Sequence, residues 1–248
     1  MTTSQPVAPP DYPESNRTTT RSPLGWRATL VILATLLLVT VLVFGSVVLV
    51  ILFIPGGRDI ALPLLAVTLV VHATLILLTL HWGLRRAGSG WHQMGLTRPT
   101  PRVLHLLWQI PTIFLLLAAV QGTAFALTGE TASNNDGIDT LFTGVGPLLV
   151  ATTFVGVALL TPIWEEMVFR GLIYGGLRRR LGFLPASVLS AAAFALVHGV
   201  PILLPYLFTA GIALAYLREF HTTLWAPITL HVTLNTFAAA VTLTAIQT

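Results

Sequence analysis

Long uncharged apolar stretches constrain the fold of this sequence more than any other feature. The first runs from Ala28 to Ile54, and the others occupy 60–84, 103–127, 145–164, 181–217 and 222–248. A helix needs about 20 apolar residues to cross a hydrocarbon layer about 30 Å thick. The fifth stretch is long enough for two such helices, and the segment from His198 to Pro201 supplies a break between them. We therefore predict an all-α, polytopic membrane helix bundle with about seven transmembrane helices, within a range of six to eight.

The composition excludes a water-soluble globular domain. Apolar residues make up 54% of the 248 residues and charged residues only 9%, where a typical globular chain carries about 25% charged residues. Cysteine is absent, which excludes disulfides, thiolate metal ligands and cysteine nucleophiles. Residues 1–22 are rich in Ser, Thr and Pro, and we expect a disordered tail there. Residues 23–248 are expected to form a single transmembrane domain.

The placement of the arginines predicts an orientation in the membrane. All thirteen basic residues are arginines. With seven alternating spans, eleven of them fall on the side of the N-terminus: Arg17, Arg21, Arg27, Arg85, Arg86, Arg98, Arg102, Arg178, Arg179, Arg180 and Arg218. The other side receives only Arg58, together with Glu130, Asp136 and Asp139. Loops rich in Lys and Arg stay in the cytoplasm, so the N-terminus is predicted to be cytoplasmic. Because this pattern explains the basic charge, nothing in the sequence supports nucleic-acid binding.

One segment within the predicted spans carries charged residues that a hydrocarbon layer disfavours. Glu165, Glu166 and Arg170 lie in the run WEEMVFR, and each would cost about 2.5–3.5 kcal/mol near a helix centre. Glu166 and Arg170 are four residues apart and lie on nearly the same helix face, so they can pair. Glu165 points about 100° away from Glu166 and has no cation near it in sequence. A buried carboxyl group within reach of water is suited to general acid or base work.

Three further polar residues fall at similar predicted depths in other spans. His198 lies late in one span, and His231 and Asn235 lie four residues apart on one face of the last span. Counted at about 1.5 Å per residue from the cytoplasmic turns, they overlap in depth with Glu165. A histidine alone in a span is more often a satisfied core residue. Together, these residues predict one polar cluster formed by three helices.

The remaining histidines carry weaker signals. His72 and His81 share a span and a face, but no acidic residue accompanies them, so we expect interhelical hydrogen bonds or an interfacial position. His92, His105 and His221 lie at predicted interfaces, where we expect them to be solvated.

The three motifs, in this order and all within predicted spans, resemble the signature of the CPBP intramembrane protease family. They are Glu165-Glu166-x-x-x-Arg170, Phe194-x-x-x-His198 and His231-x-x-x-Asn235. The family groups the type II CAAX prenyl endopeptidases with bacterial relatives linked to bacteriocin processing and self-immunity. The segment from Trp91 to Leu96 is also similar to one that often precedes the core in bacterial members. The resemblance places the protease-like core at about 91–248.

The resemblance implies peptide-bond hydrolysis inside a membrane cavity. Glu165 would be the catalytic glutamate that activates water together with His198, and His231 and Asn235 would stabilise the oxyanion. Glu166 and Arg170 would act behind them as an orienting pair. The expected partners are a membrane-associated or prenylated protein or peptide substrate and the lipid bilayer, with no cofactor. The family has also been described as metal-dependent, and then Glu165, His198 and His231 would be the zinc ligands. The absence of a helical His-Glu-x-x-His motif favours the metal-free scheme.

Two other functions remain open from the sequence alone. A non-catalytic bacteriocin-immunity or scaffold membrane protein could carry the same motifs and bind a peptide without turnover. A proton-coupled transporter could also place Glu, His and Arg within its spans, but we find no internal repeat, which many transporters have. The use of arginine without lysine suggests a GC-rich genome and hence a bacterial cell membrane.

Overall fold

The computed structural model describes residues 24–129 and 146–247, and within them the chain is all helical. The long helices are α1 (Trp26–Phe53), α2 (Ala61–Arg86), α3 (Leu106–Thr128), a continuous helix from Pro147 to Arg178, α7 (Phe183–His198), α8 (Leu204–His221) and α9 (Trp225–Gln247). Six of these seven are long and apolar enough to cross a membrane, and α7, with 16 residues, is shorter. The prediction of a polytopic all-α membrane bundle with about seven helices is confirmed. The predicted tail at 1–22 lies outside the described residues.

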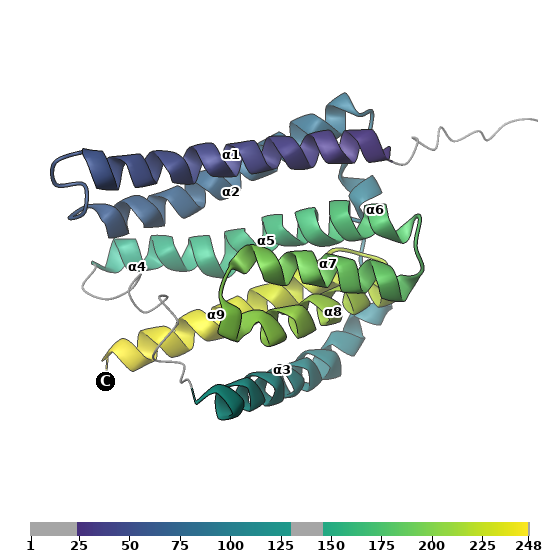
Figure 1. Cartoon of the computed structure of the whole chain (residues 1–248). Coiled ribbons are helices and arrows are strands. Elements are labelled where there is room, and N and C mark those ends of the chain that lie inside the picture. Colours follow the sequence, from purple (N-terminus) through teal and green to yellow (C-terminus); the bar gives the residue numbers. More distant parts are fainter. Residues whose placement is uncertain (1–23, 130–145, 248) are drawn as a thin grey trace, which may run out of the picture.

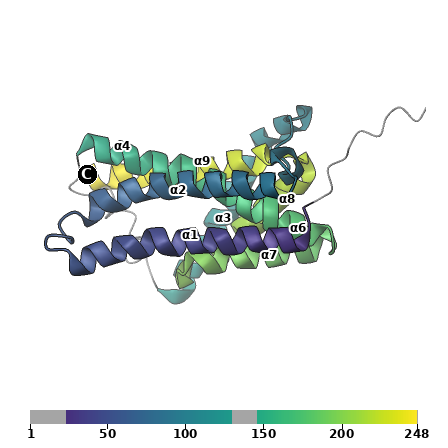
Figure 2. The same ribbon diagram turned by 90° about the horizontal axis from the view of Figure 1, so that it is seen from above.

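The helices form a bundle in which most neighbours in sequence pack side by side, with α3 as the exception. α1 and α2 form an antiparallel pair on one side, and the continuous helix lies next to α2 (Figure 1). α7 packs along α8, α9 packs against both α8 and the middle of the continuous helix, and α3 lies on the far side against α8. Figure 2 shows the α1–α2 pair from above, running nearly the full length of the molecule. The continuous helix is thus held between α2 on one side and α7 and α9 on the other.

The described arginines gather at one end of the bundle, as the alternation of spans predicts. α1 begins at this end, where α2, α6 (Gly175–Arg178) and α8 end (Figure 1). It therefore holds Arg27, Arg85, Arg86, Arg178 and Arg218, whereas Arg58 follows α1 at the opposite end. Arg17, Arg21 and the acidic loop residues Glu130, Asp136 and Asp139 lie outside the described residues. Which end faces the cytoplasm stays a prediction.

The continuous helix changes its winding on both sides of the two glutamates. It consists of α4 (Pro147–Phe154), a π-helical turn (Val155–Leu160), α5 (Thr161–Glu166), a second π-helical stretch (Met167–Tyr174) and α6. π-Helical turns inside α-helices are rare and often mark functional sites. The uncharged run 145–164 covers only the first part of this helix, which continues through Glu165 and Arg170 to Arg178. The charged motif therefore lies in the interior of a span.

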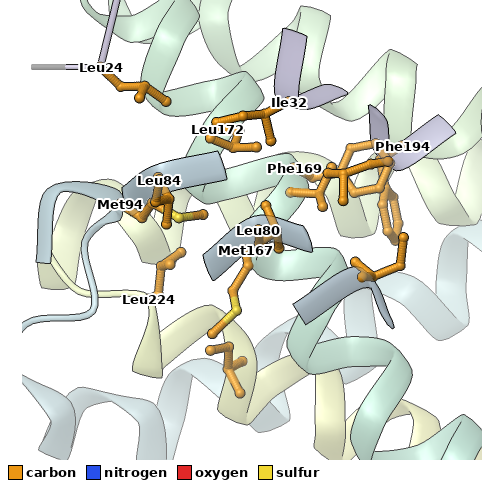
Figure 3. Close-up of a cluster of buried hydrophobic side chains, with 14 of the residues drawn as sticks. Leu24, Ile32, Leu80, Leu84, Met94, Met167, Phe169, Leu172, Phe194 and Leu224 are labelled. Carbon is orange, nitrogen blue, oxygen red and sulfur yellow. The ribbon is translucent and has the colours of Figure 1, made fainter. Parts of the chain in front are cut away.

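The largest apolar core lies between the α1–α2 pair and the continuous helix, and packing in this core holds the continuous helix against α1 and α2. Ile32 of α1 and Leu80 and Leu84 of α2 pack there against Met167 and Leu172 (Figure 3). Phe169 and Phe194 meet at the same core, with ring centroids 5.2 Å apart at 85°. By contrast, much of α1 faces outward with exposed apolar side chains such as Leu38 and Leu42, which are 56% and 62% exposed, as expected for a helix in contact with lipid.

Candidate active site

Glu166, Arg170 and His231 form a buried charged cluster between the continuous helix and α9. Arg170 Nη1 donates to Glu166 Oε1 at 2.8 Å, and neither side chain is exposed. Arg170 also donates from Nη2 to the carbonyl oxygen of Gly211 in α8 at 3.3 Å, and its guanidinium lies 4.5 Å from the ring centre of Phe194. The four-residue spacing correctly predicted the ion pair. Glu165 is only 8% exposed and Glu166 is fully buried, so neither glutamate is a solvated residue at the end of a span.

His231 contacts both glutamates. Its Nδ1 lies 2.8 Å from Oε1 of Glu166, and its Nε2 lies 3.6 Å from Oε2 of Glu165. Because Glu166 also accepts a hydrogen bond from Arg170, it is held in place and in turn orients the imidazole ring. A carboxylate that accepts from one ring nitrogen fixes the tautomer and the direction of the other. Nε2 of His231 is thereby directed toward Glu165. Sequence reasoning missed this bridge and assigned Glu166 only the pair with Arg170.

His198 enters the site from the C-terminal end of α7. Its Nδ1 lies 2.7 Å from the carbonyl oxygen of Phe194, one helical turn earlier. A carbonyl oxygen only accepts, so Nδ1 carries the proton and Nε2 of the neutral ring has a free lone pair. α7 ends directly after His198 because Gly199 adopts a left-handed conformation (φ 66°) and Pro201 follows. The ring of Phe194 lies between the two histidines, with centroids 4.6 Å from His198 and 5.6 Å from His231.

Asn235 is held by the first π-helical turn. Its Nδ2 donates to the carbonyl oxygen of Val157 at 3.0 Å. In this turn the amide of Thr161 bonds to Gly156, five residues earlier. The next residue, Pro162, has no N–H to offer the Val157 carbonyl. Pro162 thus leaves a buried carbonyl without a backbone partner, and Asn235 supplies one.

The four predicted catalytic residues line one cavity. It has a volume of about 520 Å³, and Glu165, His198, His231 and Asn235 lie on its wall. Apolar residues of α8 and α9, among them Leu207 and Leu234, form most of the remaining wall. The predicted convergence of three helices on one polar cluster is therefore present in the structure. Their catalytic roles remain proposals.

A second cavity reaches Glu165 and His198 from the opposite side. It measures 540 Å³ and lies between α1, α7 and the continuous helix. Leu36, Leu37 and Thr40 of α1 line it, together with Trp164 and Ala193. Glu165 and His198 are the titratable residues common to both cavities. A chain segment that crosses from one cavity to the other would pass directly by this pair.

The zinc alternative does not fit the side-chain geometry. Across 24–129 and 146–247, no three His, Cys, Asp or Glu side chains are grouped as a metal-ligand set. We therefore route no chemical step through a metal.

The other histidines separate into correct and incorrect predictions. His72 bonds through Nε2 to Thr40 Oγ1 at 2.9 Å, which is the expected interhelical bond. His81, at the end of α2, is exposed and stacks on Trp91, and His92 and His105 are exposed as expected. The prediction for His221 is wrong: it is 1% exposed, and its Nε2 lies 2.8 Å from Gln109 Oε1 of α3. Because α3 covers the end of α8, His221 is buried although it is the last residue of its helix.

Comparison with known proteins supports the family resemblance. Residues 147–237 match the family described as "Type II CAAX prenyl endopeptidase Rce1-like". All of the candidate catalytic residues fall inside this match. This match supports the resemblance to the CPBP family, and it includes the three motifs on which the resemblance was based.

A curated relative extends the comparison. The protein named "Putative membrane peptidase YdiL" of Bacillus subtilis (strain 168) is 32% identical over 142 residues, which cover 54% of this chain and 55% of the relative. The chain thus matches about half the length of this curated relative. No solved structure matches the chain.

Proposed function

We propose that this chain is an intramembrane endopeptidase that hydrolyses a peptide bond with water activated by Glu165 and His198. The observation that carries the proposal is that these two residues, with His231 and Asn235, line one cavity between apolar helices. An isolated buried polar residue could be structural. A carboxylate, two imidazoles and an amide from three helices around one space are the groups that acid–base hydrolysis needs.

The free lone pair on Nε2 of His198 and the carboxylate of Glu165 can both accept a proton from water. The water oxygen then attacks the carbonyl carbon, and the carbonyl oxygen becomes an oxyanion. The proton taken from water passes to the leaving nitrogen as the C–N bond breaks, which yields a carboxyl group and an amine. In this scheme Glu165, whose Oε2 lies 3.6 Å from Nε2 of His231, accepts and returns this proton.

Two donors are available for the oxyanion. Asn235 uses one amide hydrogen on Val157 and keeps the other, and His231 carries an Nε2–H when its ring is protonated. Loss of one such donor typically lowers the rate about 10²–10³-fold. Glu166 and Arg170 touch neither cavity and act as positioning residues through His231.

The apolar walls of the two cavities support a membrane-associated substrate. Both lie among helices that are apolar enough to span a bilayer, and a substrate segment could enter without exposing the site to bulk water. A protein or peptide with an apolar or prenylated C-terminal segment, as in a CAAX-like sequence, is the substrate class that we propose.

The proposal is tested with purified protein in lipid vesicles and a library of internally quenched peptides that carry an apolar or prenyl anchor. We expect cleavage by the native chain and none by Glu165→Gln or His198→Gln. A matched control is Glu219→Gln, because Glu219 pairs with Arg178 away from both cavities.

Two further outcomes would contradict parts of this proposal. If a chelator abolishes cleavage and added zinc restores it, the metal-free mechanism is wrong and a zinc-dependent one replaces it. Peptide binding without cleavage would favour the immunity or scaffold function, and proton-coupled uptake into the vesicles would favour a transporter.

A further inference from the structure

A third cavity lies on the outside of the α1–α2 pair, at the end of the bundle where the arginines gather. It measures 320 Å³, and its wall includes Arg27, Val31 and Thr35 of α1 with Trp82 and Arg86 of α2. None of these residues belongs to the segment 147–237 that matches the family, and none lines the candidate active site. We call it the α1–α2 groove.

The α1–α2 groove has two cations at its rim that find no carboxylate in the described part of the chain. Arg27 and Arg86 are both exposed and form no ion pair there. The carboxylates within 24–129 and 146–247 are occupied or remote: Asp59 precedes α2 at the opposite end of the bundle, Glu165 and Glu166 lie in the active site, and Glu219 pairs with Arg178. The guanidinium of Arg86 lies 4.5 Å from the ring centre of Trp82, which holds it at the groove.

The floor of the α1–α2 groove is apolar and faces the lipid. Gly83 lets the two helices approach closely, because a Cβ at this position would lie 2.7 Å from Cγ1 of Ile32. Above this contact, Val31 is 65% exposed and Trp82 is 53% exposed. The groove therefore combines paired positive charge at the level of a lipid headgroup with an apolar channel at the level of the acyl chains.

We propose that the α1–α2 groove binds an anionic phospholipid, with the phosphate between Arg27 and Arg86 and one acyl chain along Val31, Thr35 and Trp82. Basic pockets between transmembrane helices are suited to such headgroups. A soluble phosphate ester would satisfy the arginines but leave the apolar channel open to solvent. A zwitterionic lipid would fill the channel but bring a cation close to the two arginines. This proposal does not depend on the proposed protease activity.

The test compares lipid binding to the purified full chain by native mass spectrometry, with dioleoyl phosphatidylglycerol and dioleoyl phosphatidylcholine titrated in parallel. We expect the native chain to prefer phosphatidylglycerol. Arg27→Gln/Arg86→Gln should weaken phosphatidylglycerol binding about 30-fold, from about 5-fold for each of the two interfacial arginines, and leave phosphatidylcholine binding unchanged. Free glycerol 3-phosphate should not displace the bound lipid.

The matched control is Arg85→Gln/Arg98→Gln, which removes the same charge from the same end of the bundle but outside the α1–α2 groove. It should keep the lipid preference. Equal loss in both double variants would overturn the proposal in favour of diffuse charge attraction. Absence of any preference in the native chain, or displacement by glycerol 3-phosphate, would also overturn it.

A groove-filling variant provides a second measurement that leaves both charges in place. Thr35→Trp should lower phosphatidylglycerol binding, whereas Leu38→Trp, on the lipid-facing side of the same helix and 56% exposed, should not. If Thr35→Trp binds the lipid as the native chain does, the acyl-chain position in the proposal is wrong.

Discussion

Arg170 shows how a single residue can hold the active site together without touching substrate. Its guanidinium is fully buried and contacts Glu166, the Gly211 carbonyl and the ring of Phe194. Removing one partner of a buried ion pair leaves the other charge uncompensated, which typically costs about 3–5 kcal/mol. We therefore expect Arg170→Ala to lower the thermal unfolding temperature of the purified protein strongly.

The control for Arg170→Ala is Arg178→Ala. Arg178 also pairs with a glutamate at 2.8 Å, but its side chain is 41% exposed, and exposed ion pairs contribute little to stability. A melting curve of Arg170→Ala that matches that of Arg178→Ala would contradict the assignment of Arg170 to a buried, structurally required pair.

At the residue scale, the sequence was informative where chemistry depends on spacing along one helix. The four-residue interval between Glu166 and Arg170 was sufficient to predict their pair, and the interval between His231 and Asn235 placed both on one face. The bridge from His231 to both glutamates was not predictable in this way. It depends on the rotation of α9 against the continuous helix, which is set by packing between helices.

At the scale of a single element, the continuous helix from Pro147 to Arg178 controls the site through its π-helical turns. Pro162 removes the amide that would otherwise bond to the Val157 carbonyl, and Asn235 takes its place. Nothing in the hydropathy of the run 145–164 reveals this change in winding. Pro162 was visible in the sequence, but a proline in a helix predicts a kink or break without specifying which side chain replaces the lost bond.

Pro162→Ala tests whether this winding matters for activity. The alanine N–H can bond to the backbone, so the helix can relax toward regular α geometry and shift Glu165 relative to His198. A misplacement of about 1 Å can lower a rate about 10²-fold. We expect turnover to fall by this order while the unfolding temperature stays the same or rises. Unchanged turnover would show that the π-helical turn does not position the site.

The side chains of α1 that line the second cavity should influence substrate choice. Leu37→Trp would fill part of the 540 Å³ space next to Glu165 and His198. We expect it to raise KM most for substrates with the bulkiest anchors and to affect short, unanchored peptides little. Leu38→Trp, on the neighbouring lipid-facing position, is the control. Equal kinetics for all substrates in Leu37→Trp would exclude this cavity from the substrate path.

At the scale of the whole molecule, the alternation of spans and arginines was predictable because it depends only on the lengths of apolar runs and on charge. The break at His198–Pro201 was also readable, since Gly199 and Pro201 are strong helix-ending signals. Burial at the helix ends was not readable. His221 shows this, because the helix that covers it, α3, comes much earlier in the chain. Gln109 of α3, more than 100 residues before it, forms the hydrogen bond to His221.

The predicted orientation can be tested because the chain contains no cysteine. A single Asn135→Cys variant should react with a membrane-impermeant thiol reagent added outside intact cells. Ala87→Cys, at the end where the described arginines gather, should react only after the membrane is opened. The reverse pattern would overturn the cytoplasmic placement of the N-terminus.

The most direct test of the central claim is a terminal-peptide mass-spectrometry comparison in the natural host. Membranes that contain the native chain are compared with membranes that contain Glu165→Gln at equal abundance. If Glu165 is part of a hydrolase site, we expect new peptide termini or released peptides only in membranes with the native chain. The sequences of these peptides would identify the substrate class. Indistinguishable peptide profiles under several growth conditions would contradict the proposed protease activity.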